Sequence, residues 1–263
     1  MLTSIQNPLI KEIRKLHQAK GRREQGLFLL EGTHLLEEAC SLNYALVTVC
    51  CTPEWQERHP QLWARASSLA ERIELVSDKV LEAIATTVQP DGVVATASRR
   101  ESQLNPQISL GLALETIQDP GNLGTIIRTA VATHADGLWL SRDSVDLDHP
   151  KVLRASAGAW FRLPMAVSST LNAEISRCQR QGVQILATVP DASLSYWDID
   201  LRVPTLIVLG NEGSGLSADS IALATHQVRI PLGRGVESLN VAIAAALILY
   251  EAERQRGYKQ STN

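Results

Sequence analysis

The sequence of 263 residues lacks any long apolar run, and none of its hydrophobic stretches approaches the roughly 18 residues of a membrane-spanning helix. Its N-terminus also lacks the basic and then apolar layout of a secretory signal peptide. Neither an internal repeat nor a low-complexity segment is present. We therefore expect a soluble, cytoplasmic protein with one large or two small domains, and a domain of either size can bury its own core.

Cysteine is scarce, and its spacing does not suggest metal binding. The four cysteines include no C-x-x-C pair, and none has a histidine nearby at zinc-ligand spacing. Neither a disulfide framework nor a metal site is therefore favoured. We interpret the thiols as buried or unreactive groups in a reducing compartment; they belong to Cys40, Cys50, Cys51 and Cys178.

An excess of positive charge is also missing from the chain as a whole, whose formal net charge of -3 is untypical of a nucleic-acid-binding protein. Positive charge is concentrated locally, because six basic residues face only two acidic ones within the first 30 positions. This segment is either a solvated helix face or a surface that contacts phosphates. Its basic residues are Lys11, Arg14, Lys15, Lys20, Arg22 and Arg23.

The first hundred residues alternate between helical and strand-like patterns, which predicts a small α/β sandwich over residues 1–98. A polar stretch that ends in Asn-Pro follows and predicts a linker at 99–106. Helices are expected at 7–18, 33–40, 61–70 and 78–85, and strands at 26–30, 44–49, 73–76 and 92–97.

The alternation of strand-like and helical patterns over residues 107–263 predicts a second, larger α/β domain. The segment 205–209 is apolar throughout, which indicates a strand buried on both faces and hence a parallel sheet covered by helices. A final helix at 239–256 is apolar on almost all sides, so we expect it to be buried on several sides, including a subunit interface. Strands are expected at 111–117, 137–141, 164–168, 184–189, 205–209 and 227–231.

Three Gly/Asn-rich segments follow apolar runs in this second domain. They are Asp119–Arg128, Leu209–Leu216 and Ile230–Asn240. Each places turn residues and polar side chains at the end of an expected strand, which is where open α/β sheets build ligand sites. The sequence therefore predicts a ligand site made by these three loops.

Helix capping accounts for only part of the first and third segments. Asn122 suits the cap of a helix that starts near Gly124, and Ser238 suits the cap of the final helix. Arg128 fits less well, because a cation in the first helical turns opposes the helix dipole, and it could instead grip a phosphate. Asn240 is a poor residue inside a helix, so we expect its amide to bind something specific.

The second segment contains the pattern G-x-G-x-x-A at Gly213–Ala218, which raises the alternative of a dinucleotide site. That site needs the first βαβ unit of its domain and an acidic residue at the end of the next strand, and neither condition is met. A Walker loop is excluded because no Lys-Ser/Thr pair follows the glycines. What remains is a loop that can approach a ligand closely, with Glu212 either in the site or at a solvated turn.

Taken in this order, the three segments resemble the signature motifs of the SpoU (TrmH-like) branch of the SPOUT RNA methyltransferases. The resemblance covers nearly the whole chain, because residues 1–98 resemble the RNA-binding domain of that family. It implies an enzyme that transfers a methyl group from S-adenosylmethionine to a ribose 2'-hydroxyl of RNA. It also implies a homodimer and a C-terminal trefoil knot that forms the cofactor cleft.

The same resemblance assigns roles to individual residues. It implies that Arg128 is the catalytic arginine, that Asn122 and Glu212 organise the site, and that Ser238 and Asn240 lie on the substrate side. The implied cofactor contacts are Leu209, Gly210, Ile230, Leu239 and Thr188. The implied RNA contacts are Lys11, Arg14, Lys20, Arg22 and Arg23.

Alternatives remain open for the substrate and the activity. We favour ribosomal RNA over tRNA, because the added N-terminal domain suggests a large structured target. A non-catalytic RNA-binding protein that retains the fold is a second alternative, although the intact motif residues argue against it. An oxidoreductase would rest on the Gly213 loop alone. The proton acceptor is open as well, because a guanidinium with a pKa above about 12 is not a base.

Overall fold

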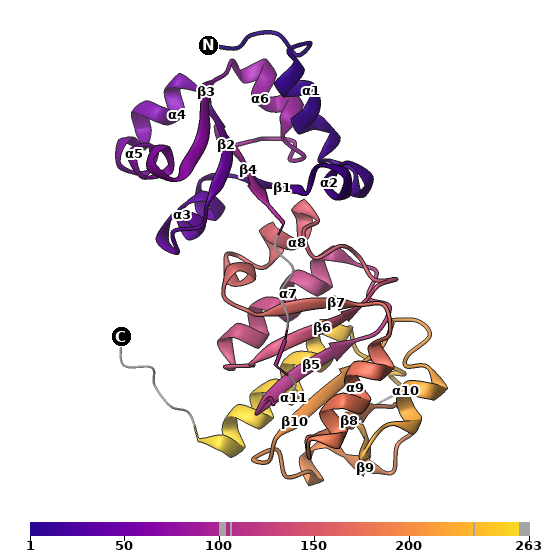
Figure 1. The fold of residues 1–263 in the computed structure, drawn as a ribbon. Coiled ribbons are helices and arrows are strands. Elements are labelled where there is room, and N and C mark those ends of the chain that lie inside the picture. Colours follow the sequence, from indigo (N-terminus) through magenta and orange to yellow (C-terminus); the bar gives the residue numbers. More distant parts are fainter. Residues whose placement is uncertain (100–103, 106, 234, 258–263) are drawn as a thin grey trace. The chain divides into compact units, whose positions relative to one another are not determined.

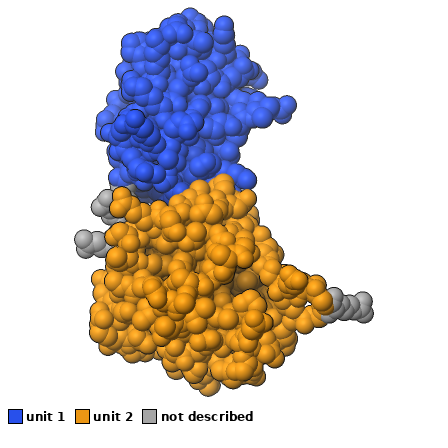
Figure 2. All heavy atoms as spheres, turned by 90° about the vertical axis from the view of Figure 1, so that its right-hand side faces the viewer, with its two compact units in different colours: residues 1–100, 146–161 blue, residues 101–145, 162–263 orange. Residues whose placement is uncertain are grey.

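The computed structural model describes residues 1–99, 104–105, 107–233 and 235–257, so most of the expected linker at 99–106 lies outside the described residues. The chain forms two compact units, coloured separately in Figure 2. Unit 1 comprises Met1–Arg100 and Asp146–Phe161, and unit 2 comprises Glu101–Val145 and Arg162–Asn263. The domain boundaries expected from the sequence stay a prediction, but the sequence did not suggest that a later segment belongs to unit 1.

Unit 1 is built on a four-stranded sheet with the order β1-β4-β2-β3 (Figure 1). The pairs β1–β4 and β4–β2 are antiparallel, and β2–β3 is parallel. The strands are β1 (Leu27–Glu31), β2 (Leu46–Cys51), β3 (Ala70–Leu75) and β4 (Val93–Ser98). The helices are α1 (Pro8–Lys15), α2 (Ala19–Gln25), α3 (Thr33–Ser41), α4 (Pro53–Arg58), α5 (Pro60–Leu69), α6 (Asp78–Ile84) and α8 (Pro150–Ala155). The expected α/β sandwich is confirmed, with α2 and α4 as helices that the sequence patterns did not predict.

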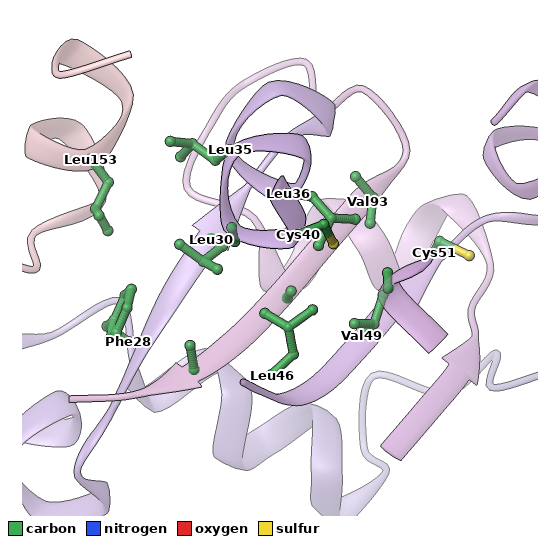
Figure 3. Close-up of a cluster of buried hydrophobic side chains, with 14 of the residues drawn as sticks. Phe28, Leu30, Leu35, Leu36, Cys40, Leu46, Val49, Cys51, Val93 and Leu153 are labelled. Carbon is green, nitrogen blue, oxygen red and sulfur yellow. The ribbon is translucent and has the colours of Figure 1, made fainter. Parts of the chain in front are cut away.

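Side chains of β1 alternate between two apolar clusters, as the two-residue period of a strand requires. Phe28 and Leu30 enter one cluster with Leu46 and Trp55, whereas Leu29 enters the other. Figure 3 shows the first cluster, in which Leu153 comes from α8 and the other labelled side chains come from Phe28 to Val93. Burial on both faces of the sheet makes unit 1 a three-layer structure.

The segment Asp146–Phe161 contributes aromatic as well as aliphatic side chains to unit 1. The ring of Trp160 lies 5.0 Å from that of Phe28, centroid to centroid, and the ring of Phe161 lies 5.3 Å from that of Tyr44. Aromatic pairs at these separations stabilise a core beyond simple area burial. The segment is therefore part of the core of unit 1.

Unit 2 contains a seven-stranded sheet with the order β7-β6-β5-β10-β8-β11-β9, in which every neighbouring pair is parallel. The expected parallel-sheet α/β domain is thereby confirmed. Six strands match the expected ones, and the seventh, β9, has two residues. The strands are β5 (Leu110–Leu114), β6 (Gly137–Ser141), β7 (Met165–Ser168), β8 (Gln184–Thr188), β9 (Leu194–Ser195), β10 (Thr205–Leu209) and β11 (His226–Arg229).

Every residue of β5, β6 and β10 is buried, because helices cover both faces of this sheet. In Figure 1, α9 lies on one face, while α7 and α11 lie on the other and pack against each other. The helices of unit 2 are α7 (Pro120–Ala132), α9 (Leu171–Arg180), α10 (Ala218–Ala222) and α11 (Val241–Arg256).

The final helix, α11, is buried within its own chain on one side only. Ile248 and Leu249 are fully buried, whereas Ile243, Leu247 and Tyr250 are 51%, 37% and 56% exposed. The expectation of burial on several sides is therefore not met inside one subunit. An apolar strip along the helix, defined by these three exposed residues, is left uncovered.

Three expectations about the chain as a whole can be compared with the described residues. All four cysteines are buried and free, as expected. The helices in the described part of the chain are too short or too polar to cross a membrane. Those same residues contain no group of three or more potential metal ligands among His, Cys, Asp and Glu.

Candidate active site

The three Gly/Asn-rich loops leave the same edge of the sheet of unit 2. Strands β5 and β10 are parallel neighbours, β8 lies beside β10, and β11 lies beside β8. The first loop follows β5, the second follows β10, and the third follows β11. Because parallel strands end at one edge, the loops come together there, where α/β sheets bind ligands.

The first loop runs into α7, whose N-cap is Asp119 and not Asn122. The Asp119 carboxylate accepts hydrogen bonds from the backbone amides of Gly121 (2.5 Å) and Asn122 (3.1 Å). Pro120 occupies the first helical position, where its missing N–H costs nothing. The expectation that Asn122 caps a helix starting near Gly124 was wrong, and the Asn122 side chain is thus available for other contacts.

Asn122 joins the three loops through its side-chain amide. Its Nδ2 donates to Oε1 of Glu212 at 2.8 Å, and its Oδ1 accepts from Nδ2 of Asn240 at 2.9 Å. Asn240 is the N-cap of α11, since its Oδ1 accepts from the backbone amide of Ala242 at 2.9 Å. The expectation that Ser238 caps this helix was wrong. Ser238 lies in the exposed segment that precedes it.

The second loop is closed by Asn211 and two glycines. The backbone amides of Asn211 and Gly215 each donate to the carbonyl of the other, at 3.1 and 3.0 Å. Gly215 has φ +69°, which favours glycine, and a Cβ added to Gly210 would lie 2.3 Å from the carbonyl of Gly215. Glycine at position 210 is therefore explained by closure of the loop, and a cofactor contact there stays a prediction.

The other proposed cofactor contacts lie at the same edge of the sheet. Leu209 ends β10 and is buried, while Thr188 ends β8 and donates its hydroxyl to the carbonyl of Val208 at 3.2 Å. Ile230 and Leu239 are half-buried, and the described residues between them form neither helix nor strand. Backbone amides and carbonyls of such a segment can recognise a ligand, because no regular ladder uses them.

Arg128, like Ser238, is a proposed catalytic residue that has no hydrogen bond to this network within the described part of the chain. It lies on the exposed side of α7, as the ninth of 13 residues. Six residues of helix place it about 9 Å along the axis from Asn122 and about 120° around it. Arg128 is not in the first helical turns either, so the expected opposition to the helix dipole does not apply.

The basic residues near the N-terminus, all in unit 1, divide into two groups. Lys11, Arg14, Lys20 and Arg23 are exposed. Arg22 is only 1% exposed, so its expected contact with RNA phosphates is wrong. Burial of a guanidinium requires partners of its own, and the carboxylates that bind Arg22 lie 124 and 126 positions away in the sequence.

The acidic partners of Arg22 come from the segment Asp146–Phe161. Its Nη2 donates to Oδ2 of Asp146 at 2.8 Å, and its Nε donates to Oδ1 of Asp148 at 3.2 Å. Its Nη1 also donates to the carbonyl of Leu16 at 3.1 Å. Arg22 therefore holds this segment within unit 1.

Residues 109–250 match the SpoU rRNA Methylase family, and residues 7–95 match an MRM3-like substrate binding domain. The chain belongs to the SpoU rRNA methylase family. The family match spans more than half of the chain and contains all three loops and the Asn122–Glu212–Asn240 network. The resemblance inferred from the three segments is confirmed.

Full-length relatives and a solved structure agree with this family. An uncharacterised tRNA/rRNA methyltransferase of Synechocystis is 50% identical over 257 residues, or 97% of this chain and 94% of the relative. A 23S rRNA (guanosine(2553)-2'-O)-methyltransferase of Bacillus subtilis is 31% identical and covers 95% and 97%. The crystal structure of an AdoMet-bound rRNA methyltransferase from Sinorhizobium meliloti has a TM-score of 0.86 and 35% identity, covering 96% and 97%.

Proposed function

We propose that this protein transfers a methyl group from S-adenosylmethionine to a ribose 2'-hydroxyl of ribosomal RNA. Membership of the SpoU family and the activities of relatives that match over nearly the whole chain support this activity. The hydrogen-bonded chain Asn240–Asn122–Glu212 carries the proposal structurally. It brings the polar residue of each motif to one edge of the sheet, as a single site requires.

The residues at this edge suit S-adenosylmethionine. The apolar side chains of Ile230 and Leu239 are half-buried and border an irregular segment whose backbone can bind an adenine. We propose that Leu209, Gly210, Thr188, Ile230 and Leu239 hold the cofactor, whose sulfonium supplies an electrophilic methyl group. The trefoil knot expected around this cleft stays part of the proposal.

A ribose hydroxyl is a weak nucleophile at neutral pH, so the site must orient it and stabilise the charge that develops. We assign this role to Arg128, whose guanidinium stays charged and therefore cannot act as the base. Asn122 and Glu212 keep the loops in place, and Ser238 and Asn240 lie on the substrate side. The identity of the proton acceptor is left open.

RNA binding is assigned to the exposed basic residues of unit 1. Lys11 and Arg14 lie on α1, and Lys20 and Arg23 lie on α2. Exposed cations of this kind contact phosphates, which fix the position of an RNA without reading its sequence. Relatives that modify 23S rRNA support ribosomal RNA as the substrate, with tRNA as the alternative.

A second copy of this chain is the proposed partner at the strip Ile243, Leu247 and Tyr250. These side chains recur at i, i+4 and i+7 along α11, so they form one continuous apolar face. Helix α7, which packs against α11, exposes Arg128. A homodimer through this face would cover the strip and bring Arg128 close to the interface.

Methyl transfer to RNA from cells that lack the gene is the direct test. Purified protein and radiolabelled S-adenosylmethionine are incubated with separated 23S rRNA, 16S rRNA and tRNA, and the modified nucleotide is mapped. We expect 2'-O-methylation of ribosomal RNA. Labelling of tRNA alone would show that tRNA, and not ribosomal RNA, is the substrate. Binding of RNA with no methyl transfer to any of the three fractions would favour the non-catalytic alternative.

A further inference from the structure

Thr116, in the loop between β5 and the first motif, has a backbone conformation that threonine rarely adopts. Its φ is +57°, in the left-handed region. A β-branched side chain is strained there, so the surrounding structure must hold the residue in place.

All three polar groups of Thr116 are bonded. Its amide donates to Oγ of Ser141 at 2.7 Å, and its hydroxyl donates to Oδ2 of Asp143 at 2.7 Å. Its carbonyl accepts from Nδ2 of Asn211 at 2.9 Å. Thr116 therefore ties the loop after β5 to the loop after β6 on one side and to the loop after β10 on the other.

Asp143 sets the direction of the hydrogen bonds behind Thr116. Its Oδ1 accepts from the hydroxyl of Ser141 at 2.6 Å, and Ser144 lies next in the chain, with its Oγ 2.9 Å from that of Ser141. The amide of Ile117 donates to Ser144 at 3.0 Å. Because an ionised carboxylate only accepts hydrogen bonds, the hydroxyls of Ser141 and Thr116 must both donate to Asp143. Hydrogen bonds from Ser141 and then Thr116 lower the pKa of Asp143, which keeps it ionised.

Asn211 connects Thr116 to the second motif, because its side chain bonds both. Its Oδ1 accepts from the amides of Gly213 (2.8 Å) and Ser214 (3.0 Å), which follow Glu212 directly. Thr116 itself lies six positions before Asn122. The two residues that meet at 2.8 Å in the site, Asn122 and Glu212, are thus carried by the two loops that Thr116 joins.

We propose that Asp143 is a positioning residue for methyl transfer, which acts through Thr116 to hold the first motif in register with the second. The proposal rests on the function proposed above, because its main readout is the rate of transfer. Within the described part of the chain, Asp143 forms no hydrogen bond with Asn122 or Glu212. Its contribution is to fix the loop in which Thr116 is strained.

The test compares Thr116→Val, which keeps the branched shape but loses the hydroxyl, with Thr116→Ser, which keeps the hydroxyl. Single-turnover transfer to ribosomal RNA from cells lacking the gene is measured at saturating S-adenosylmethionine. We expect the rate constant to fall about 10-fold or more in Thr116→Val and Asp143→Ala, and less than about 2-fold in Thr116→Ser. Binding of S-adenosylhomocysteine should change much less than the rate. A Thr116→Val enzyme with an unchanged rate overturns the proposal, as does an equally slow Thr116→Ser.

Amide hydrogen exchange separates this proposal from the proposed function. The amides of Gly213 and Ser214 should exchange faster in Thr116→Val than in wild type or Thr116→Ser, whether or not the protein transfers methyl groups. If wild type modifies no RNA but this difference is found, the proposed function fails and the bracing of the loops stands. Unchanged exchange at both amides overturns the bracing itself, and Thr116→Val supplies this answer even if Asp143→Ala does not fold.

Discussion

The side-chain amide of Asn240 donates a hydrogen bond to the side-chain carbonyl of Asn122 at 2.9 Å, across 118 positions of sequence. Asn240 also caps α11, so the start of the last helix and the first motif are held by one side chain. The other end of the Asn122 amide bonds Glu212. Disturbing Asn122 should therefore affect three loops at once.

Asn122→Asp replaces the amide that donates to Glu212 with a second carboxylate oxygen. Two carboxylates at that distance repel each other, so one of them must take up a proton or move away. We expect single-turnover methyl transfer to fall by about 100-fold. Thr125→Ala, on the same helix, is the matched control and should stay near the wild-type rate. A normal rate of transfer by Asn122→Asp would show that methyl transfer does not depend on the hydrogen-bonded network of Asn122.

Arg128→Ala tests the assigned catalytic arginine. If Arg128 orients the ribose and stabilises charge, the variant should lose about 100-fold or more in methylation, or about 3 kcal/mol of barrier. Cofactor affinity should change little, because Arg128 is not bonded to the loops that we assign to the cofactor. Arg180→Ala, an exposed arginine on α9, is the control. Near-normal turnover in a folded Arg128→Ala preparation would contradict the assignment.

Arg22 and Arg23 should behave differently although they are neighbours. Removing Arg22 leaves Asp148 buried without one of its cations, and breaking a buried pair typically costs about 3–5 kcal/mol. Arg22→Ala should thus lower the free energy of unfolding in a urea titration. Arg23 is 64% exposed, so Arg23→Ala should keep stability and reduce the salt dependence of RNA binding by about 0.7 log units per lost phosphate contact. An unchanged slope would mean that this face is only solvated surface.

Charged substitutions on two sides of α11 should separate subunit association from folding. Leu247 is 37% exposed, so Leu247→Glu should give folded monomers. Ile248 is fully buried in its own chain, and Ile248→Glu should unfold the protein because it buries an unpaired charge. Sedimentation at micromolar concentration and circular dichroism distinguish the two results. A wild-type monomer under those conditions would count against the proposed homodimer.

The buried thiols predict how the protein responds to alkaline pH. Burial raises the pKa of Cys50 and of Cys51 to about 12, and that of Cys178 to about 11. A raised folded pKa contributes stability that is complete below the unfolded value near 9 and is lost as the pH rises toward the folded value. We expect the urea midpoint to fall above pH 9. At pH 8 a thiol reagent should label the cysteines only after denaturation, and rapid labelling of the native protein would contradict this.

The local pattern of apolar and polar residues correctly predicted the elements that are evenly buried along their length. The strand 205–209 is apolar at every position and matches β10, because a strand covered on both faces leaves no polar position. Helix α2 was missed, since it consists largely of charged residues and begins with no side-chain cap. Strand β9, with two residues, is too short to show any period.

Helix ends were harder to predict where two residues could serve as the cap. Asp119 and Asn122 are both good N-cap residues, and so are Ser238 and Asn240. In each pair the structure chose the residue that the sequence had not suggested as the cap. A local pattern cannot choose between them, because either residue of a pair can accept the backbone hydrogen bonds of a helix start.

The segment Asp146–Phe161 shows the same limit on a larger scale. Nothing near Leu153 or Trp160 in the sequence indicates that they pack with Phe28, so a fragment beginning at residue 107 would leave them without that core. The packing of this segment therefore predicts that such a fragment is less stable than the whole chain. The hydrophobicity of a residue predicts that it is buried, but it does not predict which residues pack against it.

The sequence by itself determined the kind of site this protein has, because turn glycines and polar residues after buried strands report local chemistry. It placed Asn122, Glu212 and Asn240 in motifs but did not reveal that they form one hydrogen-bonded chain. Only the tertiary structure decided that Arg22 is buried against Asp148, 126 residues away, and that Thr116 joins two motifs. Contacts between distant residues depend on how strands are ordered in the sheet, and that order leaves no trace in a local pattern.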